Sequence, residues 1–271
     1  MRIEKFDSLE STNKYCEALD LAEVEDFTCY WALTQTAGIG QRGNHWEAAP
    51  GKNLTFSLVL HPSFLPAERQ FRLTQALSLA LCDFLKDLRD LKDLKDLKDL
   101  KDLKDPKDLK DFKDLKVKWP NDIYVGGKKI CGTLISTHLT THHSSFLTHH
   151  SSFLTSAVCG IGFNVNQTEF PDWVPNPVSL ALLAGRQYEL EPLLLQLLQC
   201  IASRYEALRR GDDMQREYLD CLLNLGVPAR YKYNEEEVEA TITGVDPHGR
   251  LLLTTSDGRH LCCGMKEIAL L

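Results

Sequence analysis

The sequence of 271 residues lacks both a long apolar segment and a secretory start. No apolar run approaches the roughly 18 residues that a membrane-spanning helix needs. The opening residues, MRIEKFDSLE, do not show the basic region followed by an apolar region that is typical of a signal peptide. We therefore expect a cytoplasmic protein without a membrane partner.

Paired cysteine spacing and an excess of positive charge are absent as well. The nine cysteines are an odd number, scattered without a C-x-x-C pair, which is typical of buried reduced thiols and not of a disulfide framework or a zinc site. The formal net charge of −7 gives no electrostatic reason to expect a nucleic-acid partner, because such proteins usually carry a basic face. Neither a metal centre nor nucleic-acid binding is predicted.

The composition is that of an ordinary globular protein. Hydrophobic residues make up 43% of the chain and charged residues 25%. A chain of this length can bury a sizeable core. We therefore expect one large domain, or one large and one small domain.

Two segments look like sequence expansions. Residues 85–115 repeat Lys-Asp-Leu, and a step of three residues turns about 300° on a helix, so the leucines spiral around the surface without forming one stripe. We expect a solvated insertion that lengthens the end of the preceding helix. The heptad THHSSFL occurs twice in residues 141–154. Its histidines could bind a metal ion, or the segment could form a long hairpin loop. The loop is favoured because no acidic or cysteine residue that could share a metal ion is near. These histidines are His142, His143, His149 and His150.

The remaining pattern predicts mixed secondary structure. Helical spacing of apolar residues predicts helices over residues 66–85, 190–210 and 212–224. β-branched, aromatic and alternating segments predict strands over residues 28–35, 53–61, 115–120 and 156–166, a hairpin over 123–135 turning at Gly126-Gly127, and short strands after Gly226.

The segment TQTAGIGQRGNHWE places Gly38, Gly40 and Gly43 in the spacing G-x-G-x-x-G. In a dinucleotide-binding unit the third glycine opens a helix, whereas here a loop and then a strand follow, which excludes that interpretation. A glycine loop between two strands can still wrap a small polar molecule or a phosphate, and Arg42 offers a bidentate fork for phosphate oxygens.

Four segments in this order, LESTNKY, QTAGIGQRGNHW, KWPNDIYVGGKKICGTL and GIGFNVN, resemble the catalytic domain of biotin protein ligases. The end of the chain, GVPARYKY to GMKEIALL, is similar to that family's small C-terminal SH3-like domain. The resemblance implies an α+β fold, a mixed sheet with helices as in class II aminoacyl-tRNA synthetases, followed by a small β-barrel. It implies a catalytic domain over residues 1–225, with insertions at about 86–116 and 138–155, and a second domain over residues 226–271.

The implied reaction has two steps. Biotin and Mg-ATP give biotinyl-5'-AMP and pyrophosphate, and biotin then passes to a lysine of a biotin carboxyl carrier protein. A lipoate ligase-like acyl transferase of the same fold and a weakly active biotin-binding variant are the alternatives, and K-W-P-N-D favours biotin over lipoate. The S-T-N segment begins at Ser11, so we expect no N-terminal DNA-binding domain. A monomer or weak homodimer is expected.

The resemblance also implies site residues. Lys129 matches the family's active-site lysine, and Arg42 is the second catalytic candidate, because fixed positive charge favours the meeting of two anions. Lys118 and Asp122 belong to the K-W-P-N-D block with less defined roles. The residues implied for biotin are Ser11, Thr12, Asn13, Gln35, Gly38, Ile39, Gly40, Gln41, Lys129 and Gly132. Those implied for ATP or the adenylate are Arg42, Trp46, Asn121, Lys129 and Asn164.

The glycine loop departs from the family pattern. Two positions that commonly hold arginine are Ile39 and Gln41 in this chain, and the arginine follows one place later as Arg42. Because an arginine contact to a buried phosphate contributes on the order of 2–5 kcal/mol, this departure predicts weaker ligand affinity or faster loss of the adenylate.

Overall fold

The computed structural model describes residues 1–99, 114–140, 152–265 and 267–271. Only the backbone is described for Arg42, Thr140 and residues 89–99. Most of the Lys-Asp-Leu repeat after residue 99 and all four repeat histidines lie outside the described residues.

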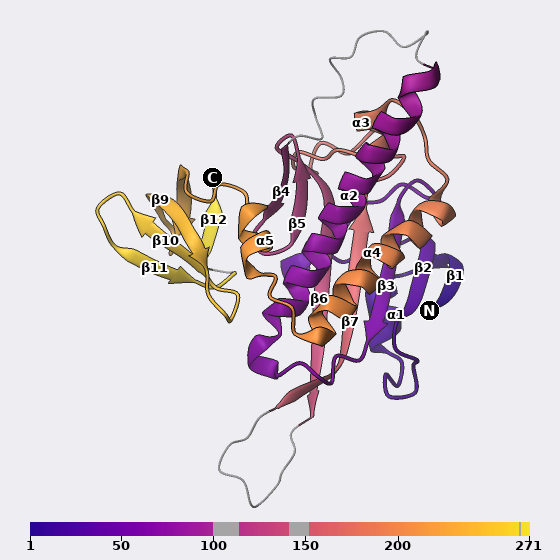
Figure 1. Ribbon diagram of the computed structural model, residues 1–271, viewed down its shortest axis with the longest axis horizontal. Coiled ribbons are helices and arrows are strands. Elements are labelled where there is room, and N and C mark those ends of the chain that lie inside the picture. Colours follow the sequence, from indigo (N-terminus) through magenta and orange to yellow (C-terminus); the bar gives the residue numbers. More distant parts are fainter. Residues whose placement is uncertain (100–113, 141–151, 266) are drawn as a thin grey trace, which may run out of the picture.

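Seven strands form one mixed sheet, in the order β1-β2-β3-β7-β6-β5-β4 (Figure 1). β1 and β2 are parallel, and every other neighbouring pair is antiparallel. The expected mixed sheet is therefore confirmed. Its strands are β1 Arg2–Leu9, β2 Thr28–Gln35, β3 Leu54–Leu60, β4 Leu115–Lys118, β5 Asp122–Val125, β6 Lys128–Thr140 and β7 Phe153–Phe163.

Two long helices, α2 and α4, pack side by side on one face of this sheet (Figure 1). α4 ends at Gly211, whose left-handed backbone (φ 86°) lets its N–H bond the carbonyls of Ala207 and Leu208. Arg204 of α4 donates to Asp83 of α2 at 2.6 Å. The helices are α1 Thr12–Glu17, α2 Phe71–Asp99, α3 Leu180–Ala184, α4 Leu190–Arg210 and α5 Gln215–Asp220, with short 3-10 turns η1 Gln41–Gly43 and η2 Ala67–Arg69.

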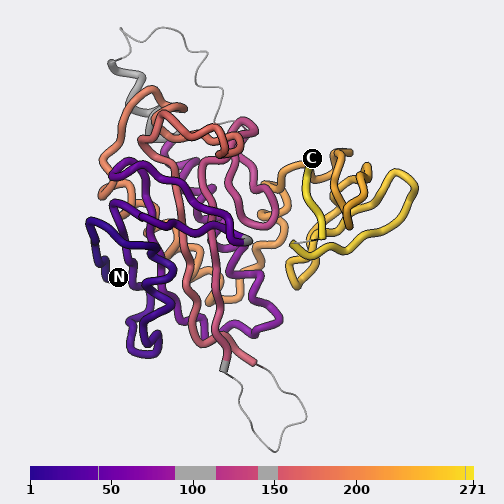
Figure 2. Tube along the Cα trace, turned by 180° about the vertical axis from the view of Figure 1, so that it is seen from behind, coloured from indigo at the N-terminus to yellow at the C-terminus, as the bar shows by residue number. Residues whose placement is uncertain are grey.

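The last five strands form a separate antiparallel sheet at the end of the molecule opposite to the N-terminus (Figure 2). It agrees with the expected small C-terminal β-domain, and its first strand begins at Pro228. The Trp119 indole N–H donates to the Gly249 carbonyl at 3.0 Å, and Gln215 donates to the Val245 carbonyl at 2.7 Å, so the turn before β5 and the start of α5 are bonded directly to the C-terminal β-domain. The strands are β8 Pro228–Tyr233, β9 Glu236–Val245, β10 Leu251–Thr255, β11 His260–Cys263 and β12 Ile268–Leu270.

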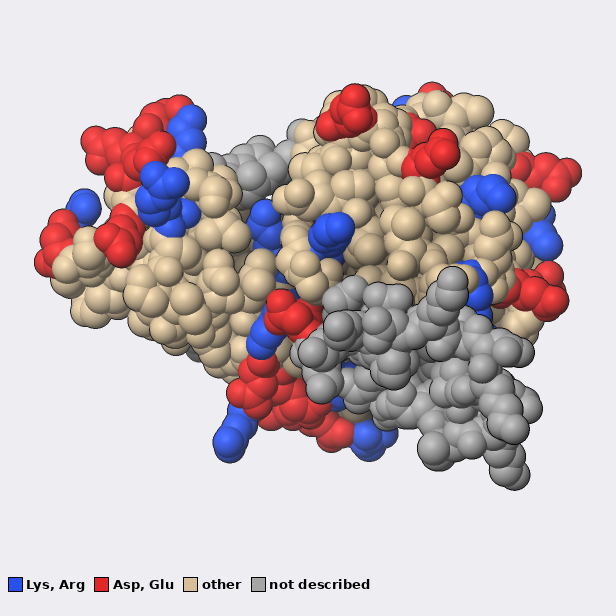
Figure 3. Space-filling model, turned by 90° about the horizontal axis from the view of Figure 1, so that it is seen from above, with Lys and Arg blue, Asp and Glu red and all other residues tan. Residues whose placement is uncertain are grey.

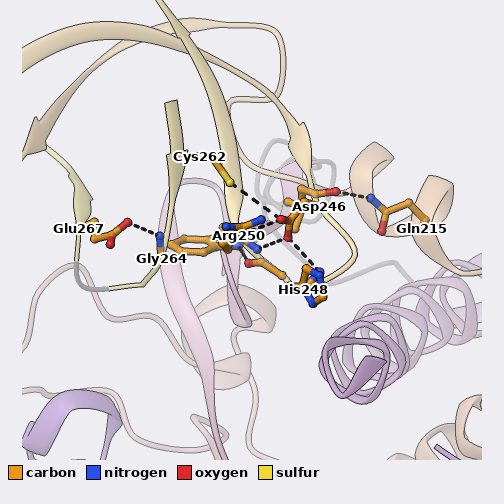
Figure 4. A network of polar contacts seen from close by, with 10 residues as sticks. Gln215, Asp246, His248, Arg250, Cys262, Gly264 and Glu267 are labelled. Carbon is orange, nitrogen blue, oxygen red and sulfur yellow. Dashed lines mark hydrogen bonds and ion pairs between the residues drawn. The ribbon is translucent and has the colours of Figure 1, made fainter. Parts of the chain in front are cut away.

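The turn between β9 and β10 is organised by Asp246 (Figure 4). Its carboxylate accepts backbone N–H bonds from His248 (2.9 Å) and Arg250 (2.8 Å), and the Arg250 Nε bond at 2.7 Å completes the set. Burial opposes ionisation, but these bonds outweigh it and lower the pKa of Asp246.

Charged side chains lie on the surface and most cysteines are buried, as the composition predicts. On the face shown in Figure 3, acidic and basic side chains lie interspersed. All nine cysteines are free and six are buried, as expected, and burial raises the pKa of Cys16 to about 12. Within the described residues, none of the helices is long and apolar enough to cross a membrane.

Candidate active site

The candidate site lies on the face of the seven-stranded sheet opposite to α2 and α4. Alternation along β3 directs Phe56 and Leu58 into the main core, whereas Ser57 between them faces α1. A cavity of about 50 Å³ opens on this face. It brings together ten of the predicted residues, namely Ser11, Thr12, Asn13, Gln35, Ile39, Gly40, Gln41, Trp46, Lys129 and Gly132.

The first wall of the cavity is the start of α1. Ser11 is the N-cap residue, and its hydroxyl accepts from the Lys14 N–H at 3.5 Å. Gln35, at the end of β2, accepts at Oε1 from the Thr12 N–H (2.7 Å) and the Thr12 hydroxyl (3.1 Å). The helix start is therefore held by the neighbouring strand, and Ser11, Thr12 and Asn13 are all buried.

Ser57 connects two of these side chains. Its hydroxyl oxygen lies 2.6 Å from Asn13 Oδ1 and 2.8 Å from the Thr12 hydroxyl. The Asn13 carboxamide is thereby oriented with its oxygen toward β3. The other end, Nδ2, is buried and has no acceptor among the described residues. Asn13 lines the cavity, so a polar ligand there would find an amide donor without a partner in the described part of the chain.

Glycine backbone forms the floor. A Cβ atom at Gly160 would overlap the Asn13 carboxamide, and one at Gly162 would overlap the Trp46 indole. Both strand positions therefore need glycine for this close approach. Gly132 pairs with Gly162 across β6 and β7, and Trp46 and Lys129 lie against it.

The glycine loop covers the cavity as expected, and it joins two strands. Within the loop, the Gly40 N–H donates to the Asn44 carbonyl at 2.7 Å and the Trp46 N–H to the Gly38 carbonyl at 2.9 Å. Of the three glycines only Gly43 has positive φ (79°), so the first two serve close packing and not a left-handed turn.

Two side chains of the loop have different surroundings. Gln41 Nε2 donates to Asn121 Oδ1 at 2.7 Å and to the Thr133 carbonyl at 3.2 Å. Ile39 lines the cavity. The backbone of Arg42 lies in η1, and its side chain is outside the described part of the chain, so its predicted catalytic role stays a prediction.

Lys129 stands at the rim of the cavity. Its ammonium lies 2.6 Å from the Asp122 carboxylate and 5.7 Å from the centre of a Trp46 ring. The carboxylate holds the lysine in place, and the indole face adds a cation–π contact. Nearby, burial lowers the pKa of Lys118, with Lys129 acting in the same direction and Asp122 opposing it.

A second cavity of about 560 Å³ lies on the other side of Trp46 and Lys129. Asn164 lines it and donates at Nδ2 to the Val178 carbonyl at 3.1 Å, while its buried Oδ1 has no donor among the described residues. Asn121, in contrast, lines a groove beyond Gln41 and lies outside both cavities.

Sequence reasoning missed Ser57, Thr133, Gly160 and Gly162. Ser57 is a fully buried hydroxyl in a strand whose other residues are apolar except Thr55, and a polar residue at such a position was the available signal. The two glycines belong to G-I-G-F-N, from which only the asparagine was selected. No local pattern pointed to Thr133. Its backbone carbonyl accepts from Gln41 only because the folded glycine loop reaches β6.

Comparison with known proteins identifies relatives that are similar in sequence over most of the chain. The bifunctional ligase/repressor BirA of Bacillus subtilis (strain 168) is 25% identical over 257 residues, covering 93% of this chain and 69% of that protein. A biotin--[acetyl-CoA-carboxylase] ligase of Paracoccus denitrificans is 26% identical, covering 93% of this chain and 94% of that protein.

A solved structure shares the fold. The biotin protein ligase from Aquifex aeolicus, in complex with biotin and ATP, superposes with a TM-score of 0.72 at 22% identity, covering 100% of this chain and 98% of that one. The sequence model of the Biotin/lipoate A/B protein ligase family matches residues 5–156, more than half of the chain. The chain therefore belongs to the biotin/lipoate A/B protein ligase family.

Proposed function

We propose that this protein activates biotin with ATP to biotinyl-5'-AMP and transfers the biotinyl group to a lysine of a biotin carboxyl carrier protein. Family membership supports ligase chemistry. The names of the Paracoccus and Aquifex relatives, which refer to acetyl-CoA-carboxylase, biotin and ATP, support these substrates.

The observation that carries the proposal is the unsatisfied Asn13 amide beside the cavity. Asn13 Nδ2 is buried without an acceptor among the described residues. The ureido ring of biotin has a carbonyl oxygen that accepts such a bond and two N–H groups that donate. The dithiolane ring of lipoate has neither, and it would leave the Asn13 amide unpaired, at a cost of about 1–3 kcal/mol. The cavity therefore favours biotin over lipoate.

In the first step a carboxylate oxygen of biotin attacks the α-phosphorus of ATP, and the bond to pyrophosphate breaks. Two anions must approach each other, so positive charge at the point of contact lowers the barrier. We assign this role to Lys129, which lies at the rim of the cavity beside Gly132. Arg42, in the loop above, is proposed as the second cation.

In the second step the neutral amine of the acceptor lysine attacks the biotinyl carbonyl carbon. The carbon–oxygen bond to phosphate breaks, AMP leaves with the electron pair, and the amine loses a proton. The same cations would stabilise the charge that develops on the leaving phosphate.

The nucleotide is assigned to the second cavity, beside Trp46 and Asn164. We keep Asn121 as a proposed contributor, although its amide is engaged by Gln41 and Thr133. The described residues include no group of three or more His, Cys, Asp or Glu side chains arranged to hold a metal. We propose that Mg²⁺ enters bound to the ATP phosphates, the usual mode in nucleotide-dependent enzymes.

Biotin-dependent exchange of labelled pyrophosphate into ATP tests the first step. Lys129→Met should lower the exchange rate by roughly 100-fold or more, the usual effect of removing one group that stabilises the transition state. Lys128→Met is the matched control, because Lys128 is the adjacent, exposed lysine of the same strand, and it should exchange normally.

Three results would contradict the proposal in different ways. Exchange with lipoate alone would place the chain with the lipoate ligases. Biotin binding without exchange would identify a weakly active variant. Equal loss in the Lys128 and Lys129 variants would refute the catalytic assignment.

A further inference from the structure

Gln41 fastens the glycine loop to the sheet through its side-chain amide. Nε2 donates to Asn121 Oδ1 at 2.7 Å and to the Thr133 carbonyl at 3.2 Å. These partners lie 80 and 92 residues further along the chain. The bonds therefore join the loop to two other segments of the fold.

Asn121 is oriented for this contact. Its Nδ2 donates to the same Thr133 carbonyl at 3.3 Å, and the residue is only 4% exposed. Both ends of the Asn121 carboxamide are thus engaged, with the oxygen turned toward Gln41. A carboxamide held from one side by β6 is a preorganised acceptor for the loop.

These bonds lie at the wall of the cavity. Gln41 and Leu134 line both the cavity and the neighbouring groove, whereas Asn121 lines the groove and not the cavity. The glycine loop also carries internal backbone bonds, from Gly40 to Asn44 and from Trp46 to Gly38. Trp46 packs on the glycine floor, and Gln41, midway along the loop, is bonded to Asn121 and to the Thr133 carbonyl.

We propose that Gln41, Asn121 and the Thr133 carbonyl form a neutral latch that keeps the glycine loop closed and sets the rate at which biotin leaves the cavity. Gln41 is a positioning residue in this proposal, and it acts through the loop. The proposal rests on the proposed function for the identity of the ligand. Because the latch contains no ion pair, its strength does not depend on ionic strength.

The test is the release of radiolabelled biotin from the full chain after addition of excess unlabelled biotin. Gln41→Met keeps the side-chain length and removes both bonds. We expect release to accelerate about tenfold, which corresponds to about 1.4 kcal/mol and lies within the range for one or two neutral hydrogen bonds. The acceleration that Gln41→Met causes should be the same at low salt and at about 0.5 M potassium chloride, because the bonds that it removes carry no charge.

Gln70→Met is the matched control. Gln70 accepts a hydrogen bond from the Thr137 hydroxyl of β6 at 2.9 Å. This variant therefore also removes a hydrogen bond between a side-chain amide and β6, but at a place away from the glycine loop. Its release rate should equal that of the wild type.

A double-mutant cycle separates a latch from two independent effects. Asn121→Leu removes one of the two Gln41 bonds, so it should accelerate release no more than Gln41→Met does. The double variant should release biotin no faster than Gln41→Met, because the Asn121 contact is already broken in that variant. If Asn121→Leu fails to fold, the Gln41 variant decides alone. Wild-type release from a folded Gln41→Met variant, or additive effects in the cycle, would overturn the latch. Absence of biotin binding by the wild type would instead refute the proposed function.

Discussion

Removing the hydroxyl of Ser57 should weaken biotin binding, although this residue reaches the cavity only through its neighbours. Ser57 is fully buried, and its hydroxyl lies 2.6 Å from Asn13 Oδ1 and 2.8 Å from the Thr12 hydroxyl. Ser57→Ala would leave both partners without this contact and would free the Asn13 carboxamide to rotate. The unpaired groups should reduce the free energy of unfolding by about 1–3 kcal/mol.

The effect on binding follows from orientation. In the wild type the Asn13 amide is held with Nδ2 free for a ligand, so the bond to biotin forms without ordering a side chain. Ordering one side chain on binding opposes it by about 0.5–1.5 kcal/mol. We therefore expect biotin affinity to fall by roughly 3- to 10-fold, measured by titration calorimetry on the folded variant.

Thr55→Val is the matched control for Ser57→Ala. Thr55 lies two residues earlier in β3, is equally buried, and donates to the Ala32 carbonyl at 2.7 Å. It should lose stability by a similar amount, measured by urea denaturation, and bind biotin normally. If both variants lose stability and neither loses affinity, Ser57 serves only the core, and the reasoning from the orientation of Asn13 is wrong.

Two further changes have defined outcomes. Ile39→Arg should tighten ATP binding by about tenfold, because a charged hydrogen bond contributes roughly 1.5–3 kcal/mol, and unchanged affinity in calorimetry would show that Ile39 is harmless. Asp246→Asn should unfold at lower urea concentration than the wild type at neutral pH. The folded-state pKa of Asp246 is lowered, so its stabilisation is complete above the ordinary value of 3.8 and is lost as pH falls through the folded-state pKa. The difference between the two proteins should therefore shrink in acid, and a difference independent of pH would contradict this account.

Most secondary structure followed from local patterns. The segments 28–35 and 190–210 were predicted with the bounds that β2 and α4 have, because apolar periodicity and a terminal glycine mark them clearly. The turn at Gly126 and Gly127 was also confirmed, since both residues have positive φ. β1 was missed, because none of the residues Arg2–Leu9 is fully buried and the strand pairs in parallel with a strand that is distant in sequence.

The candidate site was predicted less completely than the fold. Residues in recognisable segments, such as Asn13, Gln35 and Lys129, do line one cavity. The contacts between them were not predictable, because they depend on register across the sheet. Ser57 faces Asn13 only because β3 places that residue on the α1 side, and Gln41 meets Asn121 only because the loop reaches the turn between β4 and β5.

The sequence by itself determined the elements, the separate C-terminal strands and the family, since these depend on periodicity, turn residues and short motifs that act over a few positions. Tertiary structure alone decided which polar atoms are satisfied and which stay free for a ligand. The amide of Gln41 is engaged and that of Asn13 is half free, although both are ordinary carboxamides in the sequence. The reason is physical: hydrogen bonds form between groups within about 3 Å, and only the packing of a loop, a turn and a helix on the ordered strands brings residues 41 and 121, or 13 and 57, to that distance.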